Sequence, residues 1–393
     1  MNTKLILKLP KNVWSLGWVS FFNDVSSEMI YPLLPLFLTQ ALGAGVFFIG
    51  VIEGIAESLS SFLKLFSGWV SDRFRKRKGL ILFGYGLASI TRPFIGLATS
   101  AVQILFLRSV DRVGKGVRSS PRDALLSSSV DETERGKAFG FQRAMDHAGA
   151  MVGPLIASLL LALLTKNLRV VFVLSFVPAL FCLLVLSLGV RDASQNPSAR
   201  REPLRLRWSE WNGRFKTFLL IIFLFTLGNS SDAFLLLRAR DLGLETVSIP
   251  ILWFVFHLSK TVFSVPGGMV SDRIGRKKVM ILAWVVYGLV YMGFAFASQA
   301  IHVWILFIIY GFFYGLAEGT ERAWVSDLVE ESRRGTAFGA YHFTVGVGAL
   351  PASLLLGFFW KTLGVAWAFS FGATMALIAA LFAIILMKDP KKR

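Results

Sequence analysis

Cysteine and charge are both scarce in this sequence. Cys182 is the one cysteine among 393 residues, which excludes an internal disulfide and a metal site built from cysteines. Charged residues make up 17% of the chain, whereas hydrophobic residues make up 54%. Ordinary soluble domains carry roughly 25% charged residues. The composition therefore argues against a soluble enzyme and a disordered chain, and it indicates a membrane protein.

Motifs for nucleotide, metal and covalent chemistry are missing as well. The sequence has no G-x-x-x-x-G-K-[ST] run, so ATP is not the expected energy source. It has no H-x-x-H or H-x-x-x-H pair and no arrangement of a nucleophile with a base. We therefore expect no enzymatic activity, no cofactor and no resident metal. Histidines and carboxylates scattered over several helices leave metal transport as an alternative.

Long apolar stretches are abundant. A bilayer core about 30 Å thick requires about 20 mostly apolar residues per helix. Twelve stretches meet this need, which predicts an all-α polytopic membrane protein with twelve transmembrane helices. They lie near 13–38, 47–70, 79–98, 101–127, 137–164, 169–189, 217–238, 248–270, 279–297, 302–327, 336–360 and 365–387.

The net charge of +18 is distributed unevenly along the chain. Most basic residues lie at the termini and in the even-numbered loops, including dense clusters at 73–78 and 273–278. By the positive-inside rule, both termini are predicted to be cytoplasmic. The charge therefore indicates topology and contact with anionic lipid headgroups, and nucleic acid is not an expected partner. The N-terminus has too short an apolar run for a cleavable signal.

The two halves of the chain repeat each other. Gly68-Trp-Val-Ser-Asp72-Arg73 recurs as Gly268-Met-Val-Ser-Asp272-Arg273. Such repeats are typical of transporters whose substrate site lies between the two halves. We expect three parts: a six-helix bundle at 1–189, a basic cytoplasmic linker at 190–216 and a second, pseudo-symmetric six-helix bundle at 217–393.

These motifs resemble the major facilitator superfamily. GWVSDRFRKRK and GMVSDRIGRKK are similar to its loop signature G-x-x-x-D-R-x-G-R-K, although Arg75 replaces the glycine in the first copy. Arg112-Val-Gly-Lys-Gly resembles an arginine–glycine motif of the fourth helix. Gly149-Ala-Met-Val-Gly153-Pro154 resembles the G-x-x-x-G-P motif of antiporters in the fifth helix. The resemblance implies the superfamily's fold, alternating access and a monomer.

Two sets of residues follow from the repeat and the resemblance. Gly149, Gly153 and Pro154 allow close helix packing and a kink. Carboxylates beside basic clusters at the cytoplasmic helix ends form latches with arginines or helix termini, so we assign a cytoplasmic gate. The gate residues are Gly68, Asp72, Arg73, Arg118, Arg122, Gly268, Asp272, Arg273, Arg322 and Asp327.

Ionisable residues inside membrane helices mark the candidate substrate and proton site, because charge there is costly. Asp24 and Glu28 share one face of the first helix, which Pro32 and Pro35 are predicted to break or kink. Arg92 in the third helix is interpreted as structural. The full set of site residues is Asp24, Glu28, Tyr31, Arg112, Asp146, His147, Asn229, Asp232 and Glu318.

A carboxylate in a low-dielectric cavity can bind and release a proton near neutral pH. We therefore predict a secondary transporter that exports a small organic solute by proton-coupled antiport. The alternatives are uptake of a zwitterionic or metal-chelate solute, by symport or facilitated diffusion, and a non-transporting membrane sensor or scaffold. Compact loops favour a bacterial inner membrane as the location.

Overall fold

The computed structural model describes residues 9–74, 77–131, 135–192, 211–330 and 334–387. Within these ranges every regular element is a helix. The chain divides into two compact units: unit 1 comprises 1–37 and 59–203, and unit 2 comprises 38–58 and 204–393. The helix α4 (Val46–Phe74) therefore contributes its first half to unit 2 and its second half to unit 1. The boundaries expected at 189 and 217 stay a prediction, and most of the expected linker lies outside the described residues.

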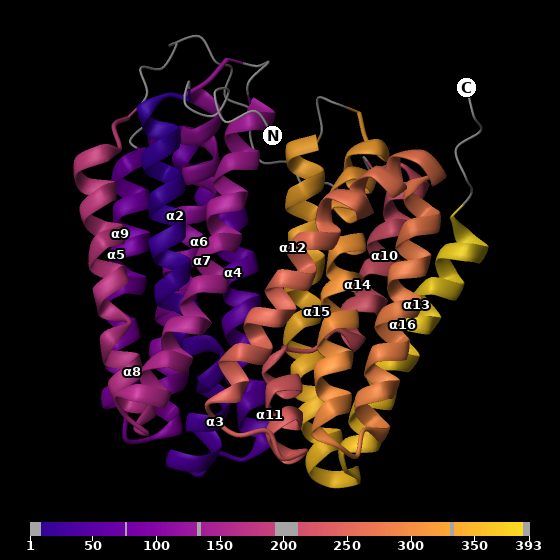
Figure 1. Cartoon of the computed structure of the whole chain (residues 1–393). Coiled ribbons are helices and arrows are strands. Elements are labelled where there is room, and N and C mark those ends of the chain that lie inside the picture. The colour runs from indigo at the N-terminus through magenta and orange to yellow at the C-terminus, as the bar shows by residue number, and fades with distance from the viewer. Residues whose placement is uncertain (1–8, 75–76, 132–134, 193–210, 331–333, 388–393) are drawn as a thin grey trace. The chain divides into compact units, whose positions relative to one another are not determined.

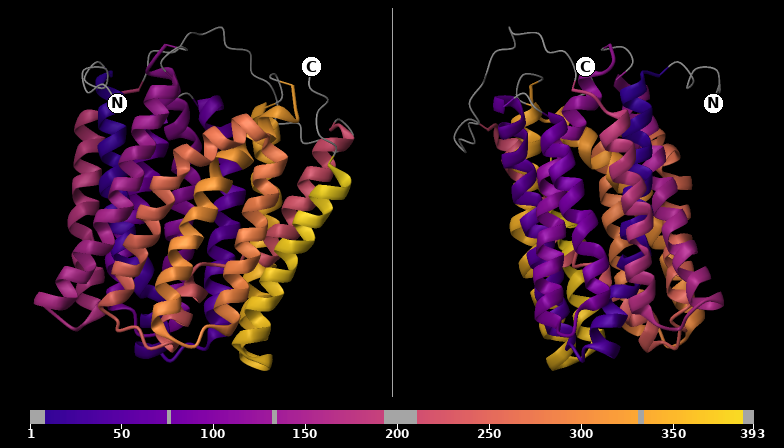
Figure 2. Two further views of the ribbon diagram at one scale, coloured as in Figure 1. Left: turned by 45° about the vertical axis from the view of Figure 1, so that its right-hand side comes forward. Right: turned by 90° about the vertical axis from the view of Figure 1, so that its left-hand side faces the viewer.

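Unit 1 contains long helices that run side by side in both figures (Figure 1, Figure 2). Among its described residues, the most extensive helix-to-helix packing is that of α2 with α7 and α9, and of α5 with α6 and α8. Besides the second half of α4, its helices are α2 (Lys11–Ile30), α3 (Leu34–Leu36), α5 (Arg77–Leu97), α6 (Ala101–Ser128), α7 (Arg135–Leu163), α8 (Leu168–Leu174) and α9 (Phe176–Gly189).

Unit 2 has a core rich in aromatic rings. Trp284, Tyr287, Tyr291 and Tyr310 are all fully buried in it. Its helix pairs include α12 with α14 and α13 with α16. The helices are α10 (Gly213–Gly228), α11 (Ala233–Asp241), α12 (Ser248–Ile274), α13 (Arg276–Phe296), α14 (Ala300–Asp327), α15 (Arg334–Leu363) and α16 (Val365–Leu386).

The predicted membrane helices are all present as helices or helix pairs. Ten helices of the described residues are long and apolar enough to cross a membrane. The other two predicted stretches correspond to α2 and α6. The second of these carries five basic and two acidic side chains, which explains its low hydropathy. It nonetheless begins cleanly, because Ser100 and Gln103 form a reciprocal capping box at its N-terminus.

Large apolar side chains lie on the outside of both units. Phe106 and Leu163 of unit 1 are exposed, and so are Val265 and Phe296 of unit 2. Water-soluble proteins rarely leave such side chains uncovered in quantity. This surface suits a surrounding lipid phase. Cys182, in contrast, is buried inside unit 1.

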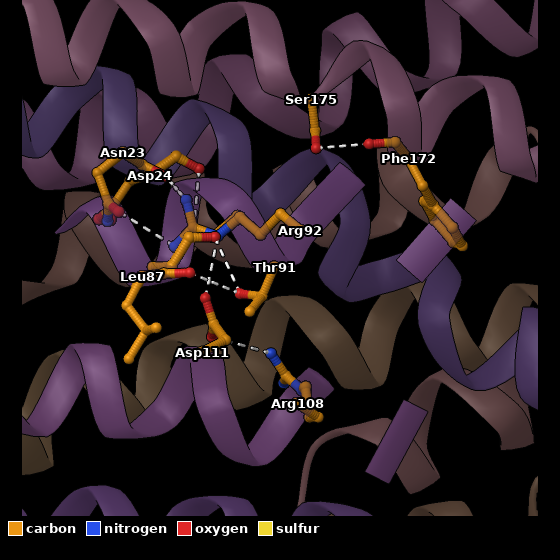
Figure 3. A network of polar contacts seen from close by, with 11 residues as sticks. Asn23, Asp24, Leu87, Thr91, Arg92, Arg108, Asp111, Phe172 and Ser175 are labelled. Carbon is orange, nitrogen blue, oxygen red and sulfur yellow. Dashed lines mark hydrogen bonds and ion pairs between the residues drawn. The ribbon is translucent and has the colours of Figure 1, made fainter. Parts of the chain in front are cut away.

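Three of the predicted transmembrane stretches are interrupted. After α2 the chain forms a 3-10 turn (Tyr31–Leu33) and then, beyond α3, a π-helical turn (Phe37–Ala41). The break predicted from Pro32 and Pro35 is thus confirmed. A second interruption separates α8 from α9 at Ser175, whose hydroxyl donates to the carbonyl oxygen of Phe172 at 2.7 Å (Figure 3).

The third interruption corrects the prediction of one continuous helix near 217–238. The structure ends α10 at Gly228 and restarts the helix as α11 at Ala233. The four residues between them, Asn229, Ser230, Ser231 and Asp232, are polar. Such side chains bond to nearby backbone groups and compete with the helical hydrogen bonds, which explains the break.

The α7 glycines lie directly against α2. A Cβ atom at Gly153 would stand 2.6 Å from the carbonyl oxygen of Val25 and 3.1 Å from the Cβ of Glu28. A Cβ at Gly149 would stand 3.1 Å from the Cβ of Asp24. Only glycine permits this approach of the two backbones. The predicted close-packing motif therefore meets the helix that carries the two candidate carboxylates, and Pro154 follows it within α7.

Enlarging Gly149 should separate these helices. We expect Gly149→Leu to lower the free energy of unfolding by about 1–3 kcal/mol through overpacking. The matched control is Gly140→Leu in the same helix, because a Cβ there meets no atom within 4 Å. Thermal unfolding of the purified protein measures both. Equal unfolding midpoints for the two variants would contradict the packing role.

Candidate functional site

The polar residues of unit 1 gather around the middle of α2. Asp24 accepts a hydrogen bond from the Nδ2 of Asn23 at 2.7 Å. Glu28 lies one turn further on, beside Gly153. At the end of the helix the ring of Tyr31 lies 5.2 Å from the guanidinium of Arg108 on α6. Asp24 and Glu28 of α2 and Tyr31 directly after it thus occupy successive turns and face two neighbouring helices.

Arg92 of α5 joins α2 to α6 (Figure 3). Its Nε bonds to the Oδ1 of Asp111 at 3.1 Å. Its two terminal nitrogens donate to the main-chain oxygen of Asn23, at 3.0 Å, and to the Oδ1 of Asn23, at 3.1 Å. Arg92 is 3% exposed and Asp111 5% exposed. The guanidinium therefore makes a buried ion pair on one side and binds α2 on the other.

This network fixes the orientation of the Asn23 amide. A guanidinium has only donors, so the side-chain oxygen of Asn23 must face Arg92. The Nδ2 group then points to Asp24, where it donates its bond. One arginine on α5 thereby orients the group that contacts a candidate proton-carrying carboxylate on α2.

Three basic residues of α6 have separate partners. Arg108 lies 3.8 Å from the second carboxylate oxygen of Asp111. Arg118 is buried, with its guanidinium 4.3 Å from the centre of the Tyr85 ring. Arg122 bonds to its neighbour Asp123 at 2.9 Å. Arg118 and Arg122, which we predicted as gate residues, thus have partners on α5 and α6 within unit 1.

On α7, the amide of Gln142 connects Asp146 to α2. Its Nε2 donates to the Oδ2 of Asp146 at 2.8 Å and to the hydroxyl of Ser20 at 2.9 Å. Arg143 lies 3.7 Å from the same carboxylate oxygen. His147 is half-buried on the next residue of the helix. The predicted pair of Asp146 and His147 therefore lies on the helix whose glycines contact α2.

In unit 2, tyrosines donate hydrogen bonds to polar groups at the break in the seventh predicted helix. The hydroxyl of Tyr310 donates to the Oδ1 of Asp232 at 2.5 Å. The hydroxyl of Tyr287 donates to the carbonyl oxygen of Gly228 at 2.9 Å, at the end of α10. A helix C-terminus leaves carbonyls without helical partners, and this tyrosine supplies one. The two candidates Asn229 and Asp232 thus bracket a break stabilised by α13 and α14.

Glu318 of α14 lies between two cations. Its Oε2 is 2.8 Å from the Nζ of Lys260 on α12, and its Oε1 is 3.2 Å from Arg322. The Lys260 ammonium also lies 4.9 Å from the centre of the Tyr314 ring. Arg322, predicted as a gate residue, therefore pairs with the candidate site residue Glu318 on its own helix.

The second copy of the repeated loop forms a small ion-pair network. Arg276 lies 2.5 Å from Asp272 and 3.3 Å from Asp327, and it donates to the Ser271 hydroxyl at 2.9 Å. Gly275 has φ = 99°, a conformation that favours glycine, and it places Arg276 at the start of α13. The network connects the ends of α12 and α14 through the first residue of α13.

The remaining gate residues differ in what the structure says of them. Gly268 is half-buried and Arg273 is exposed, both on α12. In the first copy of the loop, the side-chain surroundings of Gly68, Asp72 and Arg73 lie outside the described residues. The gate role of both copies stays a prediction.

Metal-binding geometry is not found in the described ranges. They contain no group of three His, Cys, Asp or Glu side chains placed to hold one ion. A resident metal was not predicted, and no step is derived through one.

Several residues of these networks escaped the sequence analysis. Asn23, Lys260 and Tyr310 were not among the candidates, and Arg92 was interpreted as structural without a partner. Their partners lie on helices distant in sequence, so no local spacing reveals them. Asp111 gave one signal, because it lies three residues after Arg108 and one before Arg112 on a strongly basic helix.

Removing the Asp111 charge should destabilise unit 1 strongly. Asp111→Asn leaves two buried guanidinium groups without their carboxylate, and breaking a buried ion pair costs about 3–5 kcal/mol. The control is Asp123→Asn, because the Asp123 side chain is 44% exposed and such pairs contribute under about 1 kcal/mol. Thermal unfolding compares them, and equal losses would refute the assignment of a buried network.

Comparison with known proteins identifies the family. The family model described as Major Facilitator Superfamily matches residues 16–259 and 218–393. An MFS-type transporter of Methanocaldococcus jannaschii is 37% identical over 385 residues, covering 96% of each chain. The multidrug resistance protein MdtG of Enterobacter lignolyticus is 26% identical over 305 residues, covering 72% of this chain and 70% of its own.

A solved structure agrees in fold. The nucleoside transporter NupG, in its D323A form, superposes with a TM-score of 0.79 at 15% identity, covering 96% of this chain and 100% of that one. At this identity the similarity shows the fold alone. The two-unit helical architecture, the repeated loop and the family match together establish that the chain belongs to the major facilitator superfamily and is a multi-pass secondary transporter of that type.

Proposed function

We propose that the protein exports a small organic solute in exchange for protons by alternating access. Asp24 and Glu28 carry the coupled proton in this scheme. The observation that carries the proposal is the contact of Gly149 and Gly153 with α2 at these two carboxylates. The glycine motif, which resembles that of antiporters, thereby packs directly against the part of α2 that carries the two carboxylates. We call this contact between α7 and α2 the seam. The relative named as a multidrug resistance protein also favours export.

The seam provides a physical route for coupling. Two carboxylates one helical turn apart repel each other when both are ionised, so their protons bind interdependently. Because no side chain separates Gly149 and Gly153 from α2, the charge state of Asp24 and Glu28 acts directly on the packing of α7. Asp146 and His147 on α7 extend this ionisable region, and we assign Arg112 on α6 and Tyr31, directly after α2, to the same site. In unit 2, Asn229, Asp232 and Glu318 form the matching polar set.

The topology completes the proposal. Both termini are cytoplasmic, the bundles 1–189 and 217–393 act as the two moving halves, and 190–216 connects them at the cytoplasmic face. The repeated loops gate that face. The protein works as a monomer in a bacterial inner membrane, where its basic loops contact anionic headgroups. Uptake of a zwitterionic or metal-chelate solute remains the competing direction, and the transport experiment distinguishes the two.

Transport in liposomes tests the function. The purified full chain is reconstituted with an imposed pH gradient, and solutes are screened for flux while internal pH is recorded. We expect solute movement opposite to proton movement. Solute moving in the same direction as protons would establish symport, and flux of every transported solute without proton movement would eliminate coupling.

The coupling role of α2 has its own test. Asp24→Asn combined with Glu28→Gln removes both titratable groups, so solute flux should no longer respond to the pH gradient. Asp131→Asn combined with Glu245→Gln is the matched control, because both residues are exposed. Gradient-driven transport that persists in the first double variant would assign the proton to other residues.

The gate role is tested in the second loop. Asp272→Asn removes the ion pair with Arg276, and we expect slower transport at nearly unchanged stability. An exposed pair contributes at most about 1 kcal/mol to folding, so a loss of rate reports on gating. Glu330→Gln serves as the control, since Glu330 is exposed beyond the end of α14. Normal transport by Asp272→Asn would exclude a gate at this loop.

A further inference from the structure

The α6 helix has an excess of positive charge that its own acids do not balance. It carries five basic side chains and two acidic ones within Ala101–Ser128. The two acids are already engaged: Asp111 with Arg92 and Arg108, and Asp123 with Arg122. The surplus therefore needs a counter-charge or a polarisable neighbour from elsewhere.

Almost every arginine in the helices of unit 1 has such a neighbour. Arg92 has Asp111 and Asn23, and Arg118 has the face of Tyr85. Arg143 lies near Asp146, and Arg169 of α8 donates to the carbonyl oxygens that end α5. Lys115 of α6 also interacts with a neighbouring group.

Among the arginines of these helices whose side chains the structure describes, Arg112 is the exception. Within the part of the chain that the structure describes, its guanidinium has no ion pair and no hydrogen bond, and its Nε atom is buried without a partner. The residue as a whole is half-buried, so part of the group remains accessible. An arginine side chain does not lose its proton in a protein, so the charge persists. The neighbouring Asp111 interacts with this charge electrostatically without a hydrogen bond to it. A partly buried charge without a hydrogen-bonding partner is costly, and the cost falls when an anion binds.

The position of Arg112 determines which anion can reach it. It lies 11 residues after Ala101 and 16 residues before Ser128. At 1.5 Å per residue, these intervals place it roughly 17 Å and 24 Å along the axis from the two helix ends. Lipid phosphates lie at the membrane surface, whereas transporter substrates bind near the midplane. The anion that meets Arg112 is therefore a solute and not a headgroup.

We propose that Arg112 binds an oxyanion of the transported solute, which assigns the substrate class as organic anions bearing a carboxylate, phosphonate or phosphate. The planar guanidinium donates two parallel hydrogen bonds to such a group. Arg108, one turn away, stays paired with Asp111 and adds positive potential to the same stripe of α6. The identification of this anion as a transport substrate rests on the proposed function, whereas anion binding itself does not.

Ligand binding to the full chain in detergent tests the proposal without any gradient. The probes are benzoate, phenylphosphonate and benzylammonium, which share one ring and differ in charge, at constant ionic strength. Benzoate and phenylphosphonate should raise the midpoint of thermal unfolding in a saturable manner, because a ligand that binds only the folded state stabilises it. Benzylammonium should have no such effect.

Variants locate the site. Arg112→Gln should weaken the binding of both anions by about 10- to 100-fold, the loss expected for hydrogen bonds to a charged group. Arg112→Lys keeps the positive charge but cannot donate the two parallel hydrogen bonds of a guanidinium. It should therefore bind the anions more weakly than the wild type and more tightly than Arg112→Gln. Arg214→Gln is the matched control, because it removes the same charge from an exposed position on α10.

Three outcomes would overturn the proposal: stabilisation by benzylammonium in place of the anions, no stabilisation of the wild type by either anion, or undiminished anion binding by Arg112→Gln. Anion binding should survive Asp24→Asn combined with Glu28→Gln. If that double variant binds anions normally but the wild type shows no proton-coupled flux, the coupling fails while the anion site stands.

Discussion

The architecture of unit 1 depends on one guanidinium buried where three helices meet. Arg92 satisfies Asp111 on α6 and both oxygens of Asn23 on α2. In a lipid environment an unsatisfied polar group costs several kcal/mol, so these helices cannot separate without exposing charge to hydrocarbon. The α7 glycines bring a fourth helix against the opposite side of this arrangement. The carboxylates of α2 therefore lie between a rigid ionic contact and a seam of closest packing.

Unit 2 also provides partners for its buried polar groups, but mostly with hydroxyl groups. The seventh predicted membrane helix is divided into α10 and α11. The Tyr287 hydroxyl bonds to the carbonyl oxygen that ends α10, and the Tyr310 hydroxyl bonds to the Asp232 side chain before α11. Charged side chains meet instead at Glu318, which lies between Lys260 and Arg322. The two repeats share a fold and a loop motif, but their polar interiors have diverged. The positive surplus of α6 has no equivalent on α14, which carries three acids and one base.

The length of the apolar stretches predicts the membrane helices well, because it is a local property of the sequence. The break at Pro32 and Pro35 follows from the same local reasoning. The break after Gly228 was missed, since its polar residues are compatible with either a helix or a turn until Tyr287 and Tyr310 approach them. The Arg92 network was missed for a related reason: its partners are separated by 19 and 69 residues in sequence, and only the tertiary fold brings them together.

The interruption between α10 and α11 has a mechanical consequence. A continuous helix behaves as a rod, so a tilt at one end displaces the other. At Asn229–Asp232 the helical hydrogen bonds stop. A tilt of α10 is therefore not passed rigidly to α11. One segment can therefore reorient while the other keeps its packing, with the Tyr287 and Tyr310 hydroxyls as separate tethers on either side. The seventh predicted membrane helix thus consists of two rigid segments, and the joint between them carries the Asp232 carboxylate.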